Sequence, residues 1–500
     1  MPVSLLLSFV IGYFLLLLVV AYFTSRNSNN ESFFIGNRNS NWMLVAFGMI
    51  GTSLSGVTFV SVPGAVGKEA FAYFQITLGY LLGYLVIAFV LLPLYYRLNL
   101  TSIYNYLSSR LGFASYKTGS SFFILSRTLG ATARLYLVVV ILQYAILEKL
   151  NIPFWVTTLI ILAMIMVYTY EGGVKTIVWT DTLQTTCMLA GLIICVIYIL
   201  NTMNLGLGES LQQMSEKGFA KIFYTDPGSK LFFVKQILAG AFITVTMTGM
   251  DQEMMQKNIS VKTLPDAQKN VITLSIIMLL VILLFLVLGG LLFIYAESLG
   301  ATYVTTVENG TAVTKFMLNG KDASADKLFS TIALNHMPPL VSVIFIIALI
   351  SALFPSADGA ITALTSSFCI DILGIQRRTD WTEAEKKKIR QRVHIVFAFV
   401  FLLFVLLFKW VNSSSMIGVI LKVAGYTYGP LLGLFSFGIL TKRQVNDKLV
   451  PVICVLAPLI CFVLDKYQKN IFGSFEIGLE LLIINGLLTF IGLMIISKKK

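Results

Sequence analysis

Long runs of apolar residues recur along the chain, and short polar stretches separate most of them. One run, VITLSIIMLLVILLFLVLGGLLFIYA (271–296), exceeds the roughly 20 residues that an α-helix needs to cross the ~30 Å core of a bilayer. The runs lack the alternation of apolar and polar positions that marks the ~10-residue strands of a membrane barrel. The pattern predicts an all-α integral membrane protein.

Thirteen segments have this apolar character, which predicts about 13 transmembrane helices. The first is long and opens without positive charge, so we interpret it as a helix and not as a signal peptide. An odd number of spans places the two termini on opposite sides. The segments are 3–24, 41–65, 71–97, 118–147, 152–170, 176–201, 231–256, 270–297, 339–371, 393–410, 414–440, 447–464 and 475–497.

Composition supports a membrane protein, because 57% of the 500 residues are hydrophobic, 12% are charged and the mean hydropathy is +0.84. The loops on the side of the C-terminus hold the larger share of Lys and Arg, and Lys257 is one of these residues. This bias predicts an external N-terminus and a cytoplasmic C-terminus. Basic loops beside anionic lipid explain the net charge of +13 without a nucleic-acid partner.

Two apolar segments are interrupted at corresponding places, by GTSLSG (51–56) and by TVTMTGMD (244–251). Unwound backbone at membrane depth is tolerated only where it faces protein or a polar cavity. The interruptions lie five spans apart, so they belong to units of opposite orientation, which is typical of secondary transporters. The alternative is that the small residues only allow close helix packing.

The chain therefore divides around this repeat. We expect a leading helix (1–30), a first five-helix repeat (41–201), a second, inverted five-helix repeat (231–440), and two C-terminal helices with a basic tail (445–500). The connections 202–230 and 298–327 are rich in turn residues. The charged stretch TDWTEAEKKKIRQR (379–392) predicts a short amphipathic helix within a loop.

The stretch FPSADG (354–359) places polar groups inside an apolar segment. A carboxylate such as Asp358 costs about 3 kcal/mol at this depth, so it is kept where it is paired, protonated or bound to a cation. Pro355 frees the carbonyl of Ser351, four residues earlier. Together with Ser356 these oxygens suit an alkali cation. The alternative is a kinked helix in which Asp358 is neutral or reaches the interface.

A second carboxylate, Asp181, follows Lys175 by about 9 Å of helix and lies in the inner half of its segment. A polar anchor near the interface is the alternative to a functional role. Arg127 and Arg134 are seven residues apart and share a helix face. Buried arginines need partners, so we expect one of them to pair with Asp181 or with a carboxylate of a substrate.

Four stretches resemble motifs of the sodium:solute symporter family, which includes sodium-coupled sugar, proline, sialic acid and iodide transporters. The strongest is GGVKTIVWTDTLQ (172–184), and the resemblance covers nearly the whole chain. It implies a LeuT-like fold of five plus five inverted helices, with one helix before and two after. The other stretches are GTSLSGVTFVSVPG (51–64), GMDQEMMQKNISVKTLPDAQ (249–268) and GYTYGPLLGLFSFGIL (425–440).

The resemblance also implies ion ligands. The main sodium site of the family corresponds here to Gly51, Leu54, Ala352, Pro355 and Ser356. Pro355 lacks the expected hydroxyl, which the Ser351 carbonyl or Asp358 would replace. The second sodium site of some members corresponds to Asp181 with Pro355, Asp358 and Gly359. We expect one or two coupling sodium ions, and the replacements leave open a contribution from protons.

The substrate pocket of the family corresponds to hydroxyl-bearing and aromatic positions near the two interruptions. In sugar-specific members an aromatic residue serves as the inner gate, and Met247 occupies the aligned position in this chain. The positions are Ser53, Ser55, Thr58, Tyr73, Gln75, Thr77, Thr244, Met247 and Thr248, together with Arg134. The hydroxyls with Arg134 are similar to the sialic acid branch, although a neutral sugar or another small anion is equally open.

The resemblance implies a sodium-coupled symporter that imports a small organic solute by alternating access and is not an enzyme. It implies a monomer in the lipid bilayer of a cell membrane, the inner membrane for a bacterial protein. Two alternatives are a proton-coupled transporter of the same fold and a membrane sensor with a transporter-like body. No paired-aspartate GxGD motif or histidine cluster supports an intramembrane enzyme.

Overall fold

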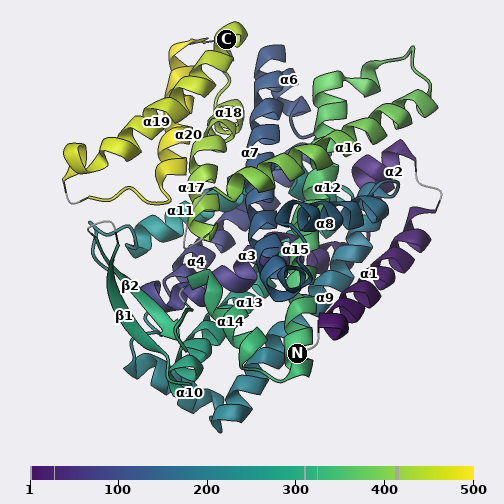
Figure 1. Cartoon of the computed structure of the whole chain (residues 1–500). Coiled ribbons are helices and arrows are strands. Elements are labelled where there is room, and N and C mark those ends of the chain that lie inside the picture. The colour runs from purple at the N-terminus through teal and green to yellow at the C-terminus, as the bar shows by residue number, and fades with distance from the viewer. Residues whose placement is uncertain are drawn as a thin grey trace.

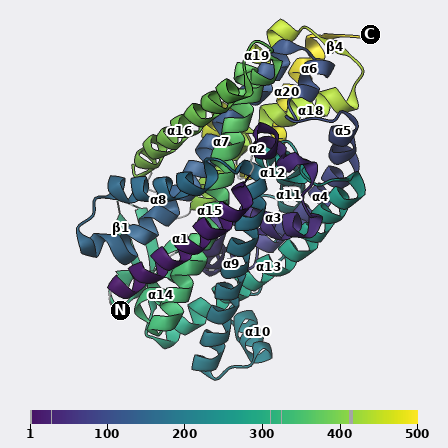
Figure 2. The ribbon, with the colours of Figure 1, turned by 90° about the vertical axis from the view of Figure 1, so that its right-hand side faces the viewer.

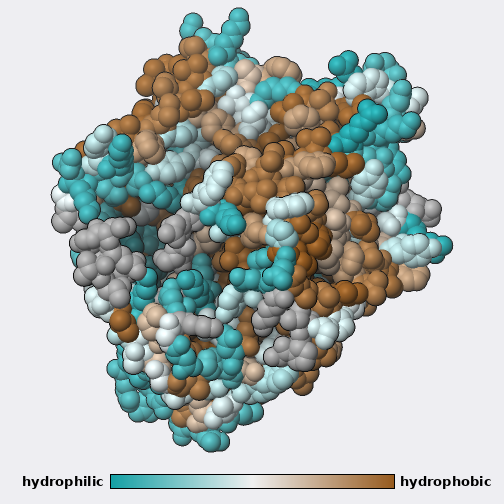
Figure 3. Space-filling model, viewed as in Figure 1, coloured by the Kyte–Doolittle hydropathy of each residue, from teal (hydrophilic) through white to brown (hydrophobic). Residues whose placement is uncertain are grey.

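The computed structural model is a bundle of long helices (Figure 1). The structure describes residues 3–26, 29–308, 311–323, 325–410, 416–473 and 475–499. Large apolar side chains are exposed on the outer helices, and Figure 3 shows a broad apolar area across the centre of one face. A surface of this kind fits lipid, because soluble monomers expose apolar patches of only a few hundred Å².

The first half of the chain is helical. Among its described residues, α1, α3, α7, α9 and the continuous segment Tyr73–Arg97, which holds α4 and α5, are each long and apolar enough to cross a bilayer. The bounds are α1 (Val3–Ser25), α2 (Asn30–Ile35), α3 (Trp42–Glu69), α4 (Tyr73–Val86), α5 (Leu92–Arg97), α6 (Asn105–Arg110), α7 (Phe113–Leu142), α8 (Phe154–Thr169), α9 (Gly173–Met203) and α10 (Leu207–Glu216).

The second half adds helices and a small sheet. The helices are α11 (Phe233–Met247), α12 (Gln252–Ile259), α13 (Leu264–Ser298), α14 (Leu328–Asn335), α15 (Pro339–Ser367), α16 (Glu383–Phe408), α17 (Met416–Thr427), α18 (Gly429–Leu440), α19 (Val450–Phe472) and α20 (Leu481–Ile495). The strands are β1 (Thr302–Glu308), β2 (Thr311–Leu318), β3 (Lys321–Asp322), β4 (Gln444–Val445) and β5 (Ser497–Lys498).

Each of the thirteen predicted segments contains helix, and the prediction of an all-α membrane protein is confirmed. The predicted count of 13 spans is not confirmed. Within the described ranges, nine helices are long and apolar enough to cross a membrane, and two bent pairs, α11 with α12 and α17 with α18, raise the number to eleven. α8 and α20 are shorter, at 16 and 15 residues. Residues 414 and 415 of the segment 414–440 lie outside the described residues.

Both predicted interruptions are present. Inside α3, Ser55 leaves helical geometry with φ 41° and ψ 165°, a conformation that a residue with a side chain rarely adopts. α11 ends at Met247 and α12 begins at Gln252, with a bend of 68° between them. Asp251 caps α12, since its carboxylate accepts hydrogen bonds from the backbone N–H groups of Glu253 and Met254. Short polar residues therefore end one helix and start the next.

The connections differ from the predictions. The stretch 202–230 contains α10, and 298–327 contains the antiparallel pair β1–β2, in which Thr302 lies opposite Met317. The charged stretch 379–392 is not a separate helix but continues into α16, because no residue breaks the helix after the Thr382 capping box. The N- and C-terminal ends lie at opposite ends of the bundle (Figures 1 and 2).

Candidate solute and cation site

A cavity of about 90 Å³ lies beside both interruptions, and hydroxyl, aromatic, cationic and apolar side chains line it. The interrupted helix α3 supplies four of the hydroxyl side chains, α7 supplies both arginines, and α17 supplies an apolar wall. The lining residues are Thr52, Ser53, Ser55, Val57, Thr58, Tyr73, Tyr80, Tyr84, Arg127, Arg134, Ile243, Thr244, Met247, Thr248, Met254, Met278, Ile417, Ile420 and Leu421.

Most of the positions predicted for a solute meet at this cavity. Those that line it are Ser53, Ser55, Thr58, Tyr73, Arg134, Thr244, Met247 and Thr248. The remaining two lie behind it. The side chain of Gln75 donates to the carbonyls of Ala72 and Leu231, and the Thr77 hydroxyl donates to the Tyr73 carbonyl. Gln75 therefore connects α4 to the chain just before α11, and Thr77 bonds to the preceding turn of its own helix.

Several lining residues were not predicted from the sequence. Tyr80 follows Tyr73 by seven residues on the same face of α4, and their hydroxyl oxygens are 3.2 Å apart. That spacing is a helical repeat which the sequence does contain. Ile417 and Ile420 come from α17, far along the chain, and nothing in their local sequence indicates the contact.

Arg127 and Arg134 both line the cavity, but their partners differ. Arg127 is 4% exposed and forms a hydrogen-bonded ion pair with Glu253, and its Nη1 lies 3.8 Å from Asp251 Oδ2. The partner of Arg127 is therefore not Asp181, one of the two options expected from the sequence. Arg134 has no hydrogen bond or ion pair with any described residue. Its guanidinium is a cation without a carboxylate.

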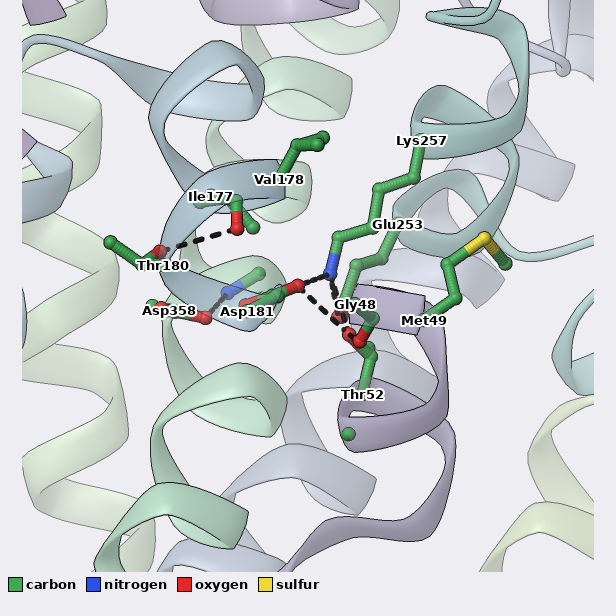
Figure 4. Close-up of polar contacts among 12 residues, drawn as sticks. Gly48, Met49, Thr52, Ile177, Val178, Thr180, Asp181, Glu253, Lys257 and Asp358 are labelled. Carbon is green, nitrogen blue, oxygen red and sulfur yellow. Dashed lines mark hydrogen bonds and ion pairs between the residues drawn. The ribbon is translucent and has the colours of Figure 1, made fainter. Parts of the chain in front are cut away.

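A third cation, Lys257 of α12, lies buried against α3 and α9 (Figure 4). Its Nζ donates to Asp181 Oδ2 at 2.7 Å and to Thr52 Oγ1 at 2.8 Å. It also lies 3.7 Å from Glu253 Oε1. The sequence had placed Lys257 in a loop. It is 1% exposed instead, because the chain between α11 and α12 bends back into the bundle.

Asp358 lies in the same region on α15 and is fully buried (Figure 4). Its Oδ2 accepts a hydrogen bond of 2.7 Å from the Tyr168 hydroxyl, and its Oδ1 accepts one from the N–H of Gly359. No lysine or arginine among the described residues lies within ion-pair distance of it. Tyr168 and Lys257 are the polar neighbours that sequence reasoning missed. Glu253 and Lys257 are four residues apart, a spacing that pairs charges on a helix.

The residues expected to hold sodium lie where α3 meets α9 and α15. A Cβ at Gly51 would lie 2.5 Å from Thr185 Oγ1 and 3.6 Å from Pro355 Cγ, so only glycine allows this approach. Leu54 and Ala352 are buried nearby in the same helices. The remaining hydroxyls have partners in the structure. Ser356 donates to the Leu353 carbonyl, and Ser351 donates to Tyr13 Oη of α1.

Comparison with known proteins identifies the family. A model of the sodium:solute symporter family matches residues 33–448, which is most of the chain. The chain belongs to this family. It is thus a sodium-coupled symporter of a small solute embedded in a membrane, and not an enzyme.

Members of the sodium:solute symporter family with known cargo are similar over most of the chain. The sodium/sialic acid symporter NanT of Aliivibrio fischeri is 22% identical over 478 residues, covering 94% of this chain and 90% of NanT. The sodium-coupled monocarboxylate transporter 1 of Mus musculus is 26% identical, covering 82% of this chain and 64% of the mouse protein. A solved Na+-coupled sialic acid symporter, in a substrate-bound outward-open state, has a TM-score of 0.81 at 19% identity, with 99% of both chains covered.

Proposed function

We propose that this symporter imports a small organic anion whose carboxylate binds Arg134. The observation that carries the proposal is that Arg134 lines the cavity without an ion-pair partner among the described residues. An unpaired charge within a membrane protein is costly, and a planar guanidinium matches a carboxylate through two parallel hydrogen bonds. A carboxylate on the solute removes that cost.

The rest of the cavity fits the uncharged part of such a solute. Ser53 Oγ is buried and has no hydrogen-bond partner among the described residues, so it is available to a ligand. Ser55 and Thr58 add hydroxyls on the same side, and Met247 and Ile420 provide an apolar side. The sialic acid and monocarboxylate relatives carry cargo with a carboxylate, which supports this class of solute.

The sodium ion would bind on the other side of α3, at Asp358 with Gly51, Leu54, Ser351, Ala352 and Ser356, and Asp181 is the carboxylate expected at a second sodium site. Residues two positions apart in the interruption face different neighbours: Gly51 contacts α9 and α15, and Ser53 lines the cavity. An ion that braces α3 against α15 thus also positions the hydroxyls that meet the solute. Coupling of this kind is reciprocal, so the solute tightens sodium binding by the same factor.

The proposal includes the arrangement in the membrane. The chain works as a monomer with the N-terminus outside and the C-terminus in the cytoplasm, in the lipid bilayer of a bacterial inner membrane. Residues 41–201 and 231–440 form the two inverted repeats, preceded by the leading helix (1–30) and followed by two helices (445–500). The matching interruptions in α3 and between α11 and α12 support this division.

A thermal-shift screen tests the proposal. We expect sialic acid, pyruvate or another carboxylate to raise the melting temperature in sodium buffer and much less in choline buffer, because a ligand that binds only the folded state stabilises it. The amide or alcohol analogue of the active compound should have no effect. A neutral sugar that shifts the wild type and the Arg134→Met variant equally would overturn the proposal.

A further inference from the structure

The buried charges around the site can be sorted by their partners. Arg127 pairs with Glu253 and lies near Asp251, which also accepts a hydrogen bond of 2.8 Å from the Tyr428 hydroxyl. Lys257 pairs with Asp181 at 2.7 Å. These groups come from α7, α9 and the α11–α12 region and pair among themselves: two cations face three carboxylates, and Asp251 also accepts hydrogen bonds from the Tyr428 hydroxyl and from two backbone N–H groups of α12. They account for all but two of the charges in this part of the structure.

The two remaining charges have opposite signs. Arg134, on α7, is a cation that lines the cavity, and Asp358 is a carboxylate on α15. Among the described residues neither has an oppositely charged side chain within 4 Å. Isolated charges within the hydrocarbon are costly, so each is expected to meet a charge that the protein does not supply itself.

Lys257 limits how many sodium ions can bind at these carboxylates. Its ammonium has the surroundings of a bound alkali ion, since one carboxylate oxygen of Asp181 and the hydroxyl oxygen of Thr52 lie within 2.8 Å of Nζ. Asp181 Oδ1 has no partner among the described residues. However, a sodium ion on Oδ1 would share a single carboxylate with the ammonium, and like charges at that separation repel strongly in a low dielectric.

Gly359 makes room for this arrangement. A Cβ at this position would lie 2.4 Å from Glu253 Oε1 and 3.1 Å from Lys257 Nζ. A side chain on α15 at position 359 would therefore push against Glu253 and Lys257. Because Gly359, next to Asp358, has no side chain, Glu253 and Lys257 can pack directly against α15.

From this geometry we infer that Lys257 is a tethered cation that takes the place of a second sodium ion at Asp181. The transporter then binds one sodium ion, at Asp358, and one monoanionic solute, at Arg134, and each cycle moves no net charge. The inference rests on the proposed function, and it adds the ion count and the electroneutral cycle.

Binding of radiolabelled sodium to the purified full-length protein, without solute, tests the ion count. We expect one ion per chain at saturation for the wild type. Lys257→Ser removes the tethered cation and leaves space and a hydroxyl beside Asp181, so this variant should bind two. The double variant Lys257→Met with Asp181→Asn removes both charges of the pair and should again bind one.

The outcomes separate the inference from the proposed function. Two ions bound to the wild type, one ion bound to a folded Lys257→Ser variant, or two bound to the double variant would overturn the inference while sodium coupling stands. No saturable sodium binding to the wild type would overturn the sodium site of the proposed function itself. Lys257→Ser leaves a buried carboxylate without its partner and can fail to fold; Lys257→Asn, which removes the charge and keeps an N–H donor for Asp181, is then counted in its place, with two ions expected and one ion contradicting the inference.

Discussion

Asp181 and Asp358 are both buried carboxylates on neighbouring helices, yet their surroundings are opposite. Asp181 has an internal cation, Lys257, at 2.7 Å. Among the described residues, Asp358 has as partners only the Tyr168 hydroxyl and the backbone N–H of Gly359. The sequence predicted an ion at both. The structure separates a carboxylate that pairs with a lysine of the protein from one that has no such partner among the described residues, and the proposal assigns the sodium ion to the second.

The arginines of α7 repeat this contrast with the sign reversed. Arg127 is neutralised by Glu253 and Asp251, whereas Arg134 faces the cavity alone. In each pair the residue with an internal partner is expected to matter for stability. The residue without one is expected to matter for binding. Substitutions at the paired and unpaired positions therefore test whether paired charges matter for stability and unpaired charges for binding.

Removing Arg127 is expected to have the largest effect. Arg127→Met leaves Asp251 buried without a cation and leaves Glu253 with Lys257 alone, 3.7 Å from its Oε1, and loss of one partner of a buried pair costs about 3–5 kcal/mol. The melting temperature of the purified protein should fall by many degrees, whether or not solute is present. A normal melting temperature combined with lost solute binding would instead make Arg127 a ligand.

Arg134→Met should weaken solute binding and hardly change stability. Hydrogen bonds to a charged group contribute about 1.5–3 kcal/mol, which corresponds to a roughly 10- to 150-fold loss of affinity. Isothermal titration with the active carboxylate measures the change. Arg134→Lys keeps the charge but loses the planar fork, so its affinity should lie between the other two. Equal affinity in all three proteins would place the solute carboxylate elsewhere.

Asp358→Asn should raise the sodium concentration that gives half-maximal stimulation of uptake at least tenfold, because the ion loses its only anionic ligand. Asp371→Asn is the matched control. Asp371 is a buried carboxylate at the end of the same helix, and its hydrogen-bond donors are Ser102, Ser367 and Tyr116. The control should lose stability but keep the sodium dependence. Identical sodium curves for Asp358→Asn and the wild type would remove Asp358 from the ion site.

Ser356→Ala should have the smallest effect, about 1 kcal/mol or a several-fold weaker response to sodium, since a single neutral oxygen is lost. In the structure its hydroxyl donates to the Leu353 carbonyl. Sodium titration of uptake in proteoliposomes measures the shift. A shift larger than that of Asp358→Asn would reverse the ranking of the two ligands.

The fold could largely be predicted from the sequence because the bilayer imposes simple rules. Apolar length located the helices, and polar clusters such as GTSLSG located the interruptions. The number of spans could not be fixed in this way. α8 and α20 are short helices inside longer apolar segments, and the strands β1 and β2 lie in a connection without a strong local pattern.

The site was only partly predictable for a different reason. Hydroxyls and Arg134 near an interruption could be assigned to a cavity from their type and position. The partners of the charges could not, because Arg127 meets Glu253 across 126 positions and Lys257 meets Asp181 across 76. The bend between α11 and α12 brings Lys257 inward, and only three-dimensional packing reveals that bend.

The voltage dependence of uptake tests most directly the claim that the two unpaired charges are the cargo sites. Proteoliposomes holding the purified protein would take up labelled sialic acid, or another carboxylate that the screen identifies, with sodium outside. A potassium gradient with valinomycin sets an inside-negative potential. We expect the same initial rate with and without this potential, because one sodium ion and one monoanion move together. A rate that rises several-fold with the potential would show net inward positive charge and contradict the assignment.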